Sequence, residues 1–86
     1  MINWIQGQTD RFKCLVTHDG VFSTVSMFYA TEEMWFPYNE YCPLDKPGCS
    51  PYKDGEREGY EKWNPERYIE NWKTPHLVIH GDKDYR

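Results

Sequence analysis

HLVIHGD, residues 76–82, is the stretch that decides the fold. It is a short apolar run closed by Gly-Asp, a pattern typical of a buried β-strand that ends in a turn. A second run of the same kind, FKCLVT at residues 12–17, is followed by His-Asp-Gly. We therefore expect two buried strands, over about 13–17 and 76–80, that lie side by side in parallel and are joined by a right-handed crossover.

Segments with helical patterns lie before and between these strands. Residues 1–7 place apolar side chains at helical spacing and end in Gly, and residues 23–36 form another candidate helix. In residues 64–72, Asn64 can cap a helix and Pro65 fits its first turn. This alternation of helices and buried strands predicts an α/β fold with a parallel sheet.

The composition limits the size and the class of the protein. With 86 residues the chain fits one small domain at most. Its aromatic content of 17% argues against disorder, because disordered chains are poor in aromatic residues. The net charge of −4, without a basic run, disfavours nucleic acid as a partner. No stretch approaches the roughly 20 apolar residues that a membrane-spanning helix needs, so we expect no membrane partner either.

Residues 38–62 are rich in Pro, Gly, Tyr and charge, and we predict that they form an insertion loop. Within this segment, Cys42 and Cys49 flank a stretch rich in Pro and Gly, a spacing that suits a small disulfide-closed loop. We predict a disulfide between them, of the kind that forms in oxidising compartments. Cys14 lies in an apolar run and is expected to be a buried, free thiol.

A metal site is the alternative use of the cysteines. Structural zinc sites need four close ligands, and the chain has no Cys-x-x-Cys pair. The three histidines, His18, His76 and His80, are scattered along the sequence. We therefore expect no metal ion, and we expect no cofactor.

Three segments follow one another in a recognisable order, namely TDRFKC at 9–14, WNP at 63–65 and LVIHGDKDYR at 77–86. Together they resemble the catalytic domain of the prolyl oligopeptidase family, an α/β-hydrolase, in which the last segment reads apolar-x-apolar-His-Gly-x-x-Asp. The resemblance covers nearly the whole chain except about 38–61, and it is closest to the fungal dipeptidyl-peptidases. It implies that residues 1–86 are part of one α/β-hydrolase catalytic domain.

The resemblance also implies functional residues. The aspartate of the last segment falls on Asp84, and in the family it is the acid of a Ser-Asp-His catalytic triad. Asp82 is the competing carboxylate, but its spacing does not fit the family pattern. The family segment that corresponds to Val21, Phe22 and Met27 helps to line the apolar pocket for the residue before the cleaved bond. Plain core packing of these three side chains is an alternative of equal weight.

In the family, the nucleophilic serine lies in a Gly-x-Ser-x-Gly elbow upstream of the first helix, and the histidine comes from a later loop. The resemblance therefore implies that the chain begins after the serine, stops after the aspartate and is inactive alone. Ser23, Ser26 and Ser50 lie in no such setting. His18 and His80 are expected to bond local backbone groups rather than to act as the catalytic base.

The resemblance further implies that the parent protein is a secreted serine exopeptidase of the dipeptidyl-peptidase type that acts on peptides. Its partners would be the remainder of the catalytic domain and an N-terminal β-propeller. Two alternatives stay open: a disulfide-closed, aromatic-rich module that binds carbohydrate or protein, and a carboxylesterase-like hydrolase on the same scaffold. Trp35, Phe36 and Tyr38 would stack on a sugar in the first case and form a packed aromatic cluster otherwise.

Overall fold

The structure is a computed structural model that describes residues 1–43, 45–46 and 48–86. The elements are, in chain order, α1 (Ile2–Gln6), β1 (Leu15–His18), α2 (Thr24–Ala30), α3 (Trp35–Tyr41), α4 (Glu58–Lys62), the 3₁₀ helix η1 (Pro65–Asn71) and β2 (His76–Ile79). Among the described residues, no helix has both the length and the apolar character needed to cross a membrane.

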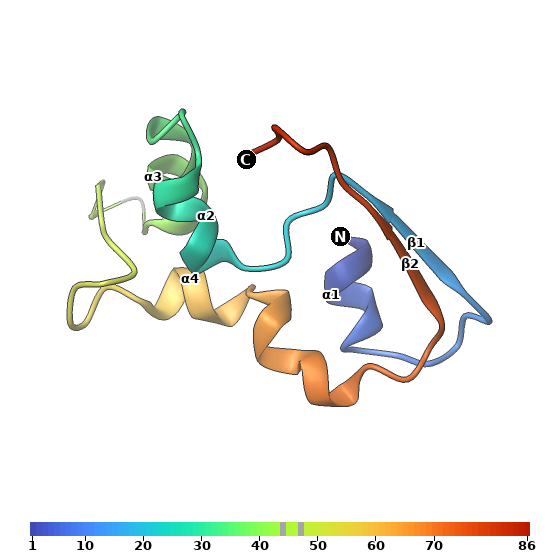
Figure 1. Ribbon diagram of the computed structural model, residues 1–86. Helices are drawn as coiled ribbons and strands as arrows, with labels where there is room; N and C mark the ends of the chain where they lie inside the picture. Colours follow the sequence, from blue (N-terminus) through green and yellow to red (C-terminus); the bar gives the residue numbers. More distant parts are fainter. Residues whose placement is uncertain (44, 47) are drawn as a thin grey trace.

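The elements form two parts, which Figure 1 shows side by side. The first part, here called the sheet region, comprises residues 1–22 and 64–86 and holds the β1–β2 sheet with α1 and η1. The second part, here called the helical lobe, comprises residues 23–63 and holds α2, α3 and α4. The chain enters the lobe after β1 and leaves it just before η1.

The two strands pair in parallel, as predicted from the sequence. Leu15 lies opposite His76, and His18 lies opposite Ile79. The ladder continues beyond β1, because Asp19 N donates to Ile79 O at 2.8 Å. Since both strands run in the same direction, their carboxyl ends meet at one edge of the sheet, and Asp19 lies at that edge.

The strands are less buried than the sequence predicts. Side chains of a strand point alternately to its two faces, and in β1 Leu15 and Thr17 are buried whereas Val16 (53% exposed) and His18 are exposed. Helix α1 contacts β1 on one side, and within the described residues no second layer covers the other (Figure 1). The prediction of two buried strands is therefore wrong for this chain. Cys14 shares the open face with Val16, so it is exposed rather than buried as predicted.

Helix α1 faces the sheet with polar side chains. Asn3 and Gln6 are both buried. Asn3 donates from Nδ2 to Val21 O (3.0 Å), and its Oδ1 accepts from Thr17 Oγ1 (2.9 Å). Gln6 Nε2 donates to Thr74 O at 2.6 Å. A buried network of hydrogen bonds therefore fixes α1 to the segments that flank the two strands.

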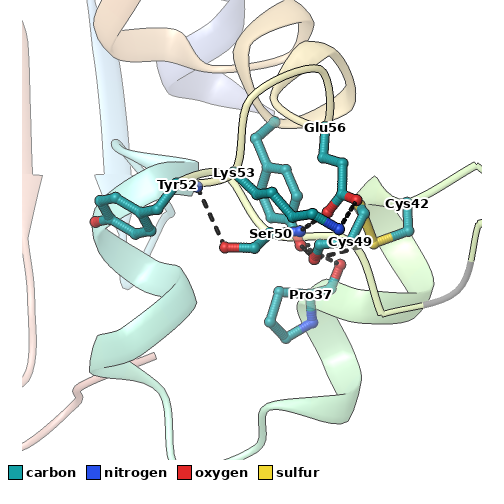
Figure 2. Close-up of a disulfide and its surroundings, with 8 residues drawn as sticks. Pro37, Cys42, Cys49, Ser50, Tyr52, Lys53 and Glu56 are labelled. Carbon is teal, nitrogen blue, oxygen red and sulfur yellow. Dashed lines mark hydrogen bonds and ion pairs between the residues drawn. A yellow bond between two sulfur atoms is a disulfide. The ribbon is translucent and has the colours of Figure 1, made fainter.

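The helical lobe has an apolar core of its own. Phe28 and Tyr60 are fully buried and pack edge to face, with ring centroids 5.5 Å apart. The predicted disulfide between Cys42 and Cys49 is present beside them, with a Cα–Cα distance of 5.5 Å (Figure 2). The Tyr60 hydroxyl donates to Cys49 O at 3.0 Å, so the polar end of the buried phenol is satisfied inside the core.

The predicted helix over 23–36 is in fact two helices with a break at Thr31. Thr31 is extended (φ −73°, ψ 143°), and its hydroxyl accepts from Glu33 N at 3.1 Å. This local bond offers the backbone a turn in place of the next helical hydrogen bond. Residues 38–62, the predicted insertion loop, hold the end of α3, the disulfide and α4; residues 44 and 47 of that segment lie outside the described residues.

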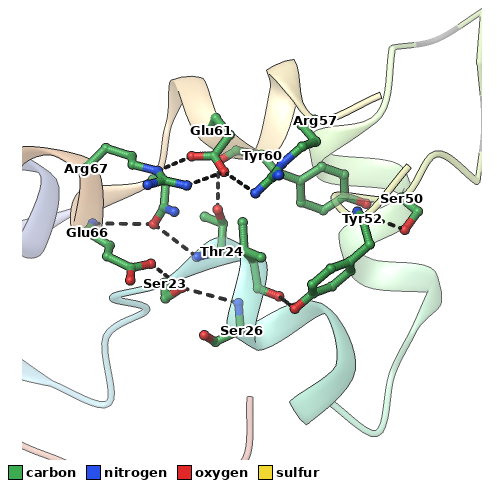
Figure 3. Close-up of polar contacts among 12 residues, drawn as sticks. Ser23, Thr24, Ser26, Ser50, Tyr52, Arg57, Tyr60, Glu61, Glu66 and Arg67 are labelled. Carbon is green, nitrogen blue, oxygen red and sulfur yellow. Dashed lines mark hydrogen bonds and ion pairs between the residues drawn. The ribbon is translucent and has the colours of Figure 1, made fainter. Parts of the chain in front are cut away.

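Asn64 joins the sheet region to the helical lobe. Its Oδ1 accepts from Glu66 N (3.3 Å), which caps η1 as predicted, and also from Thr24 N (3.2 Å) at the start of α2. The Thr24 hydroxyl donates to Tyr60 O at 2.7 Å. Figure 3 shows Thr24, Tyr60 and Glu66 gathered at this junction. One buried amide side chain therefore orders the first turns of α2 and η1 together.

Candidate active site

An open cleft of about 530 Å³ lies where the carboxyl ends of β1 and β2 face α2 and η1. Its walls come from the segment after β1, from α2, from η1 and from residues 84–86. Figure 1 shows the C-terminal segment running from the end of β2 toward α2. In parallel α/β sheets, ligands bind outside the carboxyl ends of the strands, and a cleft of this size suits a small ligand or a few residues of a peptide. The cleft is therefore the candidate active site.

One wall of the cleft is apolar. Val21, Phe22 and Met27, which the sequence analysis assigned to a substrate pocket, all line the cleft. The Phe22 ring stands edge-on to Trp72 with ring centroids 5.6 Å apart, and Met27 is buried. Ile69 of η1 extends the same lining. A wall of this composition can accept an apolar side chain of a ligand.

Asp84 also lines the cleft. It follows β2 by one turn, in which Asp84 N donates to Gly81 O at 3.1 Å. Its Oδ1 accepts from Arg86 N (3.1 Å), and its side chain is 35% exposed. Asp82 is exposed and is not part of the cleft lining. A carboxylate that the backbone holds at the cleft in this way can accept an imidazole N–H.

Two further titratable side chains lie close to Asp84. Asp19, at the end of β1, has a φ of +53°, and its Oδ1 accepts from Gly81 N at 2.9 Å. His80 Nε2 lies 2.9 Å from the backbone oxygen of Asp84 and 3.8 Å from its Oδ2. His80 Nδ1 lies 3.9 Å from Asp19 Oδ1. His80 thus bonds a local backbone group, as its place at a strand end predicts.

These three side chains could also approach a metal ion. Donor atoms of Asp19, His80 and Asp84 all lie within 4.8 Å of one another. Three donors, each about a third or more exposed, fall short of the four ligands of a structural zinc site. Exposed acidic groups commonly lie this close without an ion. We assign no metal-binding role to them.

The serines of the described segments form no pair with a histidine base. Ser23 donates to Glu66 Oε2 (2.7 Å) and accepts from Ser26 N (3.2 Å), which caps α2 (Figure 3). Another hydroxyl, Thr17 Oγ1, lies 2.7 Å from His76 Nε2. Because the Thr17 hydroxyl already donates its proton to the buried amide of α1, His76 Nε2 must carry the proton of this contact. A nitrogen in that state cannot act as a base, so the contact is structural.

Sequence reasoning missed several polar groups of the cleft. Glu66 and Asn3 both belong to the lining. In the sequence, Glu66 follows Asn-Pro and looks like a charge that complements a helix end. No local signal shows that it faces α2, because its contact with Ser23 joins residues 43 positions apart. Asn3 lies in a short segment that is interpreted from the helical spacing of its apolar residues, and this spacing gives no role to a polar side chain.

Clear pKa shifts occur in the helical lobe and at its border. Burial raises the pKa of Tyr60 to about 12. The hydrogen bond from Arg67 lowers the pKa of Glu61, and the hydrogen bond from Lys53 lowers the pKa of Glu56 (Figures 2 and 3). These shifts arise from packing and from ion pairs away from the cleft, so they indicate structural roles.

Comparison with known proteins supplies the family. The sequence model of the prolyl oligopeptidase family matches residues 1–86. The chain is 47% identical to dipeptidyl-peptidase 5 of Schizosaccharomyces pombe and 43% identical to dipeptidyl-peptidase 5 of Aspergillus fumigatus over its whole length, and 41% identical to dipeptidyl-peptidase 4 of Giardia intestinalis over 99% of it. It spans only 11–12% of the length of these relatives, and no solved structure matches it significantly. The chain belongs to the prolyl oligopeptidase family.

Proposed function

We propose that the chain is part of the α/β-hydrolase catalytic domain of a secreted serine exopeptidase of the dipeptidyl-peptidase type, here called the parent peptidase. Membership of the family and three relatives named dipeptidyl-peptidase support this activity. The observation that carries the roles of individual residues is the cleft. Asp84 and the apolar residues Val21, Phe22 and Met27 line it together, at the carboxyl ends of β1 and β2.

In the proposed reaction, Asp84 is the acid of a Ser-Asp-His triad whose serine and histidine lie elsewhere in the parent peptidase. The histidine takes the serine proton while the serine oxygen attacks the peptide carbonyl, and it then gives that proton to the leaving amine. Water resolves the acyl-enzyme by the same route. Asp84 accepts the imidazole N–H, fixes the tautomer and stabilises the imidazolium. Its Oδ1 accepts from Arg86 N, and among the described residues its Oδ2 has only His80 Nε2 nearby, at 3.8 Å, so Oδ2 is the oxygen open to the imidazole.

Asp19 is the other carboxylate at this edge of the sheet, and the geometry favours Asp84 over it. Asp19 Oδ1 accepts from Gly81 N, and Asp19 Oδ2 lies 3.2 Å from His18 Nε2, so both of its oxygens have partners within the segment. Asp19 is not part of the cleft lining, whereas Asp84 is. A triad acid must reach a histidine above the cleft, and this requirement supports Asp84.

The apolar wall supports a peptide substrate with an apolar residue before the cleaved bond. Val21 and Phe22 directly follow the edge of the sheet that carries the proposed acid, so a side chain held by them lies close to the reacting carbonyl. Packing of Phe22 on Trp72 and burial of Met27 hold the wall in place. A rigid wall of this kind favours pre-organised binding of the substrate side chain.

We further propose that the remainder of the parent peptidase covers the open face of the sheet and includes an N-terminal β-propeller. Val16 is 53% exposed, Leu77 58% and Ile79 45%, and strands of α/β sheets are normally covered by helices on both faces. The relatives are long enough for such parts, because the chain spans only 11–12% of them. The disulfide of the helical lobe supports a secreted location.

The test of the catalytic assignment is Asp84→Asn in the parent peptidase, assayed with a chromogenic dipeptidyl substrate. Asn keeps the size of the side chain but cannot stabilise the imidazolium, so we expect kcat to fall by about 10⁴. The matched control is Asp82→Asn, in the same turn but exposed and outside the cleft lining, and it should keep its kcat. Normal activity of Asp84→Asn, together with an inactive Asp82→Asn, would contradict the assignment.

A chimera tests whether this particular chain can serve in a peptidase. Residues 1–86 replace the homologous segment of the dipeptidyl-peptidase 5 of S. pombe, with which they share 47% identity. We expect dipeptidyl-peptidase activity from the chimera and its loss on Asp84→Asn. The 86-residue chain alone should hydrolyse no peptide, since it has no serine in a Gly-x-Ser-x-Gly setting. Robust hydrolysis by the chain alone would overturn the proposal.

A further inference from the structure

The side chain of Asp19 connects the end of β1 to the turn that carries the proposed triad acid. Its Oδ1 accepts from Gly81 N at 2.9 Å, although the two residues are 62 positions apart. Gly81 opens the turn after β2, and Asp84 N closes it by donating to Gly81 O at 3.1 Å. Asp19 therefore holds the base of the turn from the neighbouring strand.

We propose that Asp19 is a positioning residue for Asp84. The Asp19 carboxylate fixes the turn over 81–84 against the end of β1, and thereby fixes the Asp84 carboxylate at the cleft. This inference rests on the proposed role of Asp84 in the triad. Asp19 acts through the turn, since it is outside the cleft lining.

Close packing around Gly81 supports this mechanical link. A Cβ placed on Gly81 would lie 3.4 Å from the Cβ of Asp84 and 3.8 Å from Oδ1 of Asp19. The Asp84 side chain and the Asp19 oxygen therefore both lie within van der Waals distance of the Cβ position on Gly81. His80 Nε2 donates to the backbone oxygen of Asp84 at 2.9 Å, which holds the far end of the same turn.

The backbone of Asp19 gives a second, independent indication. Its φ of +53° lies in the left-handed region, which Gly, Asn and Asp enter far more readily than other residues. Such conformations persist where surrounding contacts over-determine them, and they cluster at functional sites. Asp19 is held here by its own N–H, which donates to Ile79 O at 2.8 Å, and by the bond of its side chain to Gly81. The conformation aims the carboxylate across the sheet edge.

The two properties of Asp19 can be separated by substitution in the parent peptidase. Asp19→Gly keeps the left-handed backbone but removes the acceptor for Gly81 N–H. Asp19→Asn is the matched control, because Asn tolerates the same backbone and keeps an amide oxygen as acceptor. Both variants are made in the wild-type background and with Asp84→Asn, and kcat, KM and the thermal midpoint are measured with a dipeptidyl substrate.

We expect Asp19→Gly to lower kcat by about 10- to 100-fold without changing KM, because a misplaced acid affects the transition state and not substrate binding. Asp19→Asn should keep most of the wild-type kcat. With Asp84→Asn already present, Asp19→Gly should cost nothing more, since there is no longer an ionised acid to position. If Asp19→Gly lowers the thermal midpoint, kcat of all variants is compared at a temperature well below the lowest midpoint, so that unfolding does not contribute to the loss.

Each other outcome overturns the proposal. A wild-type kcat for Asp19→Gly would show that the bond does not matter for Asp84. An Asp19→Asn variant as slow as Asp19→Gly would assign the effect to the charge and not to the hydrogen bond. Equal losses with and without Asp84→Asn would reveal general damage to the fold. Failure of the proposed triad role is recognised separately, because Asp84→Asn alone would then keep its activity.

Discussion

The helical lobe and the sheet region are held together by different kinds of contact. The lobe encloses an apolar core of Phe28, Cys49 and Tyr60. The sheet region buries polar side chains such as Asn3 and Gln6, while the apolar residues of its strands, apart from Leu15, are not buried. In the described residues the lobe therefore has an apolar core of its own, although it also exposes large aromatic side chains, namely Tyr29, Trp35, Tyr52 and Trp63. The sheet region is held together mainly by directed hydrogen bonds. The helical lobe therefore has a stable core, whereas the sheet region presents the edge at which the candidate active site lies.

The candidate active site lies where these two kinds of packing meet. The lobe contributes Met27, a buried residue of α2, to the apolar wall. The sheet region contributes Asp84, whose position depends on hydrogen bonds of the turn after β2. Hydrogen bonds fix the orientation of a side chain more strictly than apolar contacts do, and a catalytic acid must be oriented toward its histidine. A pocket wall needs shape, which close apolar packing provides.

The largest expected effect is on the lobe core. Phe28→Ala removes a ring that is 99% buried and packs on Tyr60, so it should destabilise the lobe by about 3 to 5 kcal/mol. Val16→Ala on the open face of the sheet is the matched control in the 86-residue chain, and it should cost less than about 1 kcal/mol, because half of that side chain is exposed. Amide hydrogen exchange, resolved by region, measures both changes. Equal costs for the two variants would contradict the contrast between the regions.

Features with strong local signals were predictable from the sequence. The parallel strands follow from two apolar runs that are each followed by turn residues. The cap of η1 follows from Asn64-Pro65, because Asn accepts from the first N–H groups of a helix and Pro fits its first turn. The disulfide between Cys42 and Cys49 follows from a short spacing around turn-forming residues. These signals act over a few residues, so no knowledge of the tertiary structure is needed to use them.

Features that depend on distant partners were not predictable. Cys14 is exposed because its face of the sheet has no covering layer, which an apolar run cannot reveal. The break at Thr31 depends on a side chain choosing a backbone N–H over the helix. Glu66 enters the cleft because of its contact with Ser23, far away in the sequence. The register of Asp84 came from the resemblance to the family, since a turn carboxylate alone gives no such signal.

The disulfide tests whether the lobe is a unit of its own. Replacing Cys42 and Cys49 by Ser opens a loop with a sequence separation of 7, which should destabilise the lobe by about 2 to 3 kcal/mol through the entropy of the unfolded chain. Protection of amides in α2 and α4 should fall, whereas amides of β1 and β2 should be unaffected. Hydrogen exchange of the 86-residue chain, with and without the two substitutions, gives the measurement. Equal loss of protection in the strands would show that the two regions unfold together.

The smallest expected effect concerns Asn64, the residue through which the two regions communicate. Its side chain is fully buried, and Oδ1 serves both Thr24 N and Glu66 N. Asn64→Ala leaves Thr24 N–H without its acceptor and leaves Glu66 N–H with Phe22 O alone (3.2 Å), so we expect a cost of about 1 to 2 kcal/mol. Unlike Phe28→Ala and the replacement of the disulfide, Asn64→Ala should lower the protection of amides from exchange on both sides of the junction, at the start of α2 and at the start of η1. Asn64→Ser is the control, because its hydroxyl oxygen keeps an uncharged N-cap acceptor and it should lose much less. Exchange rates of the Thr24 and Glu66 amides report the result directly. If Asn64→Ala changed one of these amides and left the other as it was, the joint would belong to one region alone and the lobe would be independent of the sheet at this point.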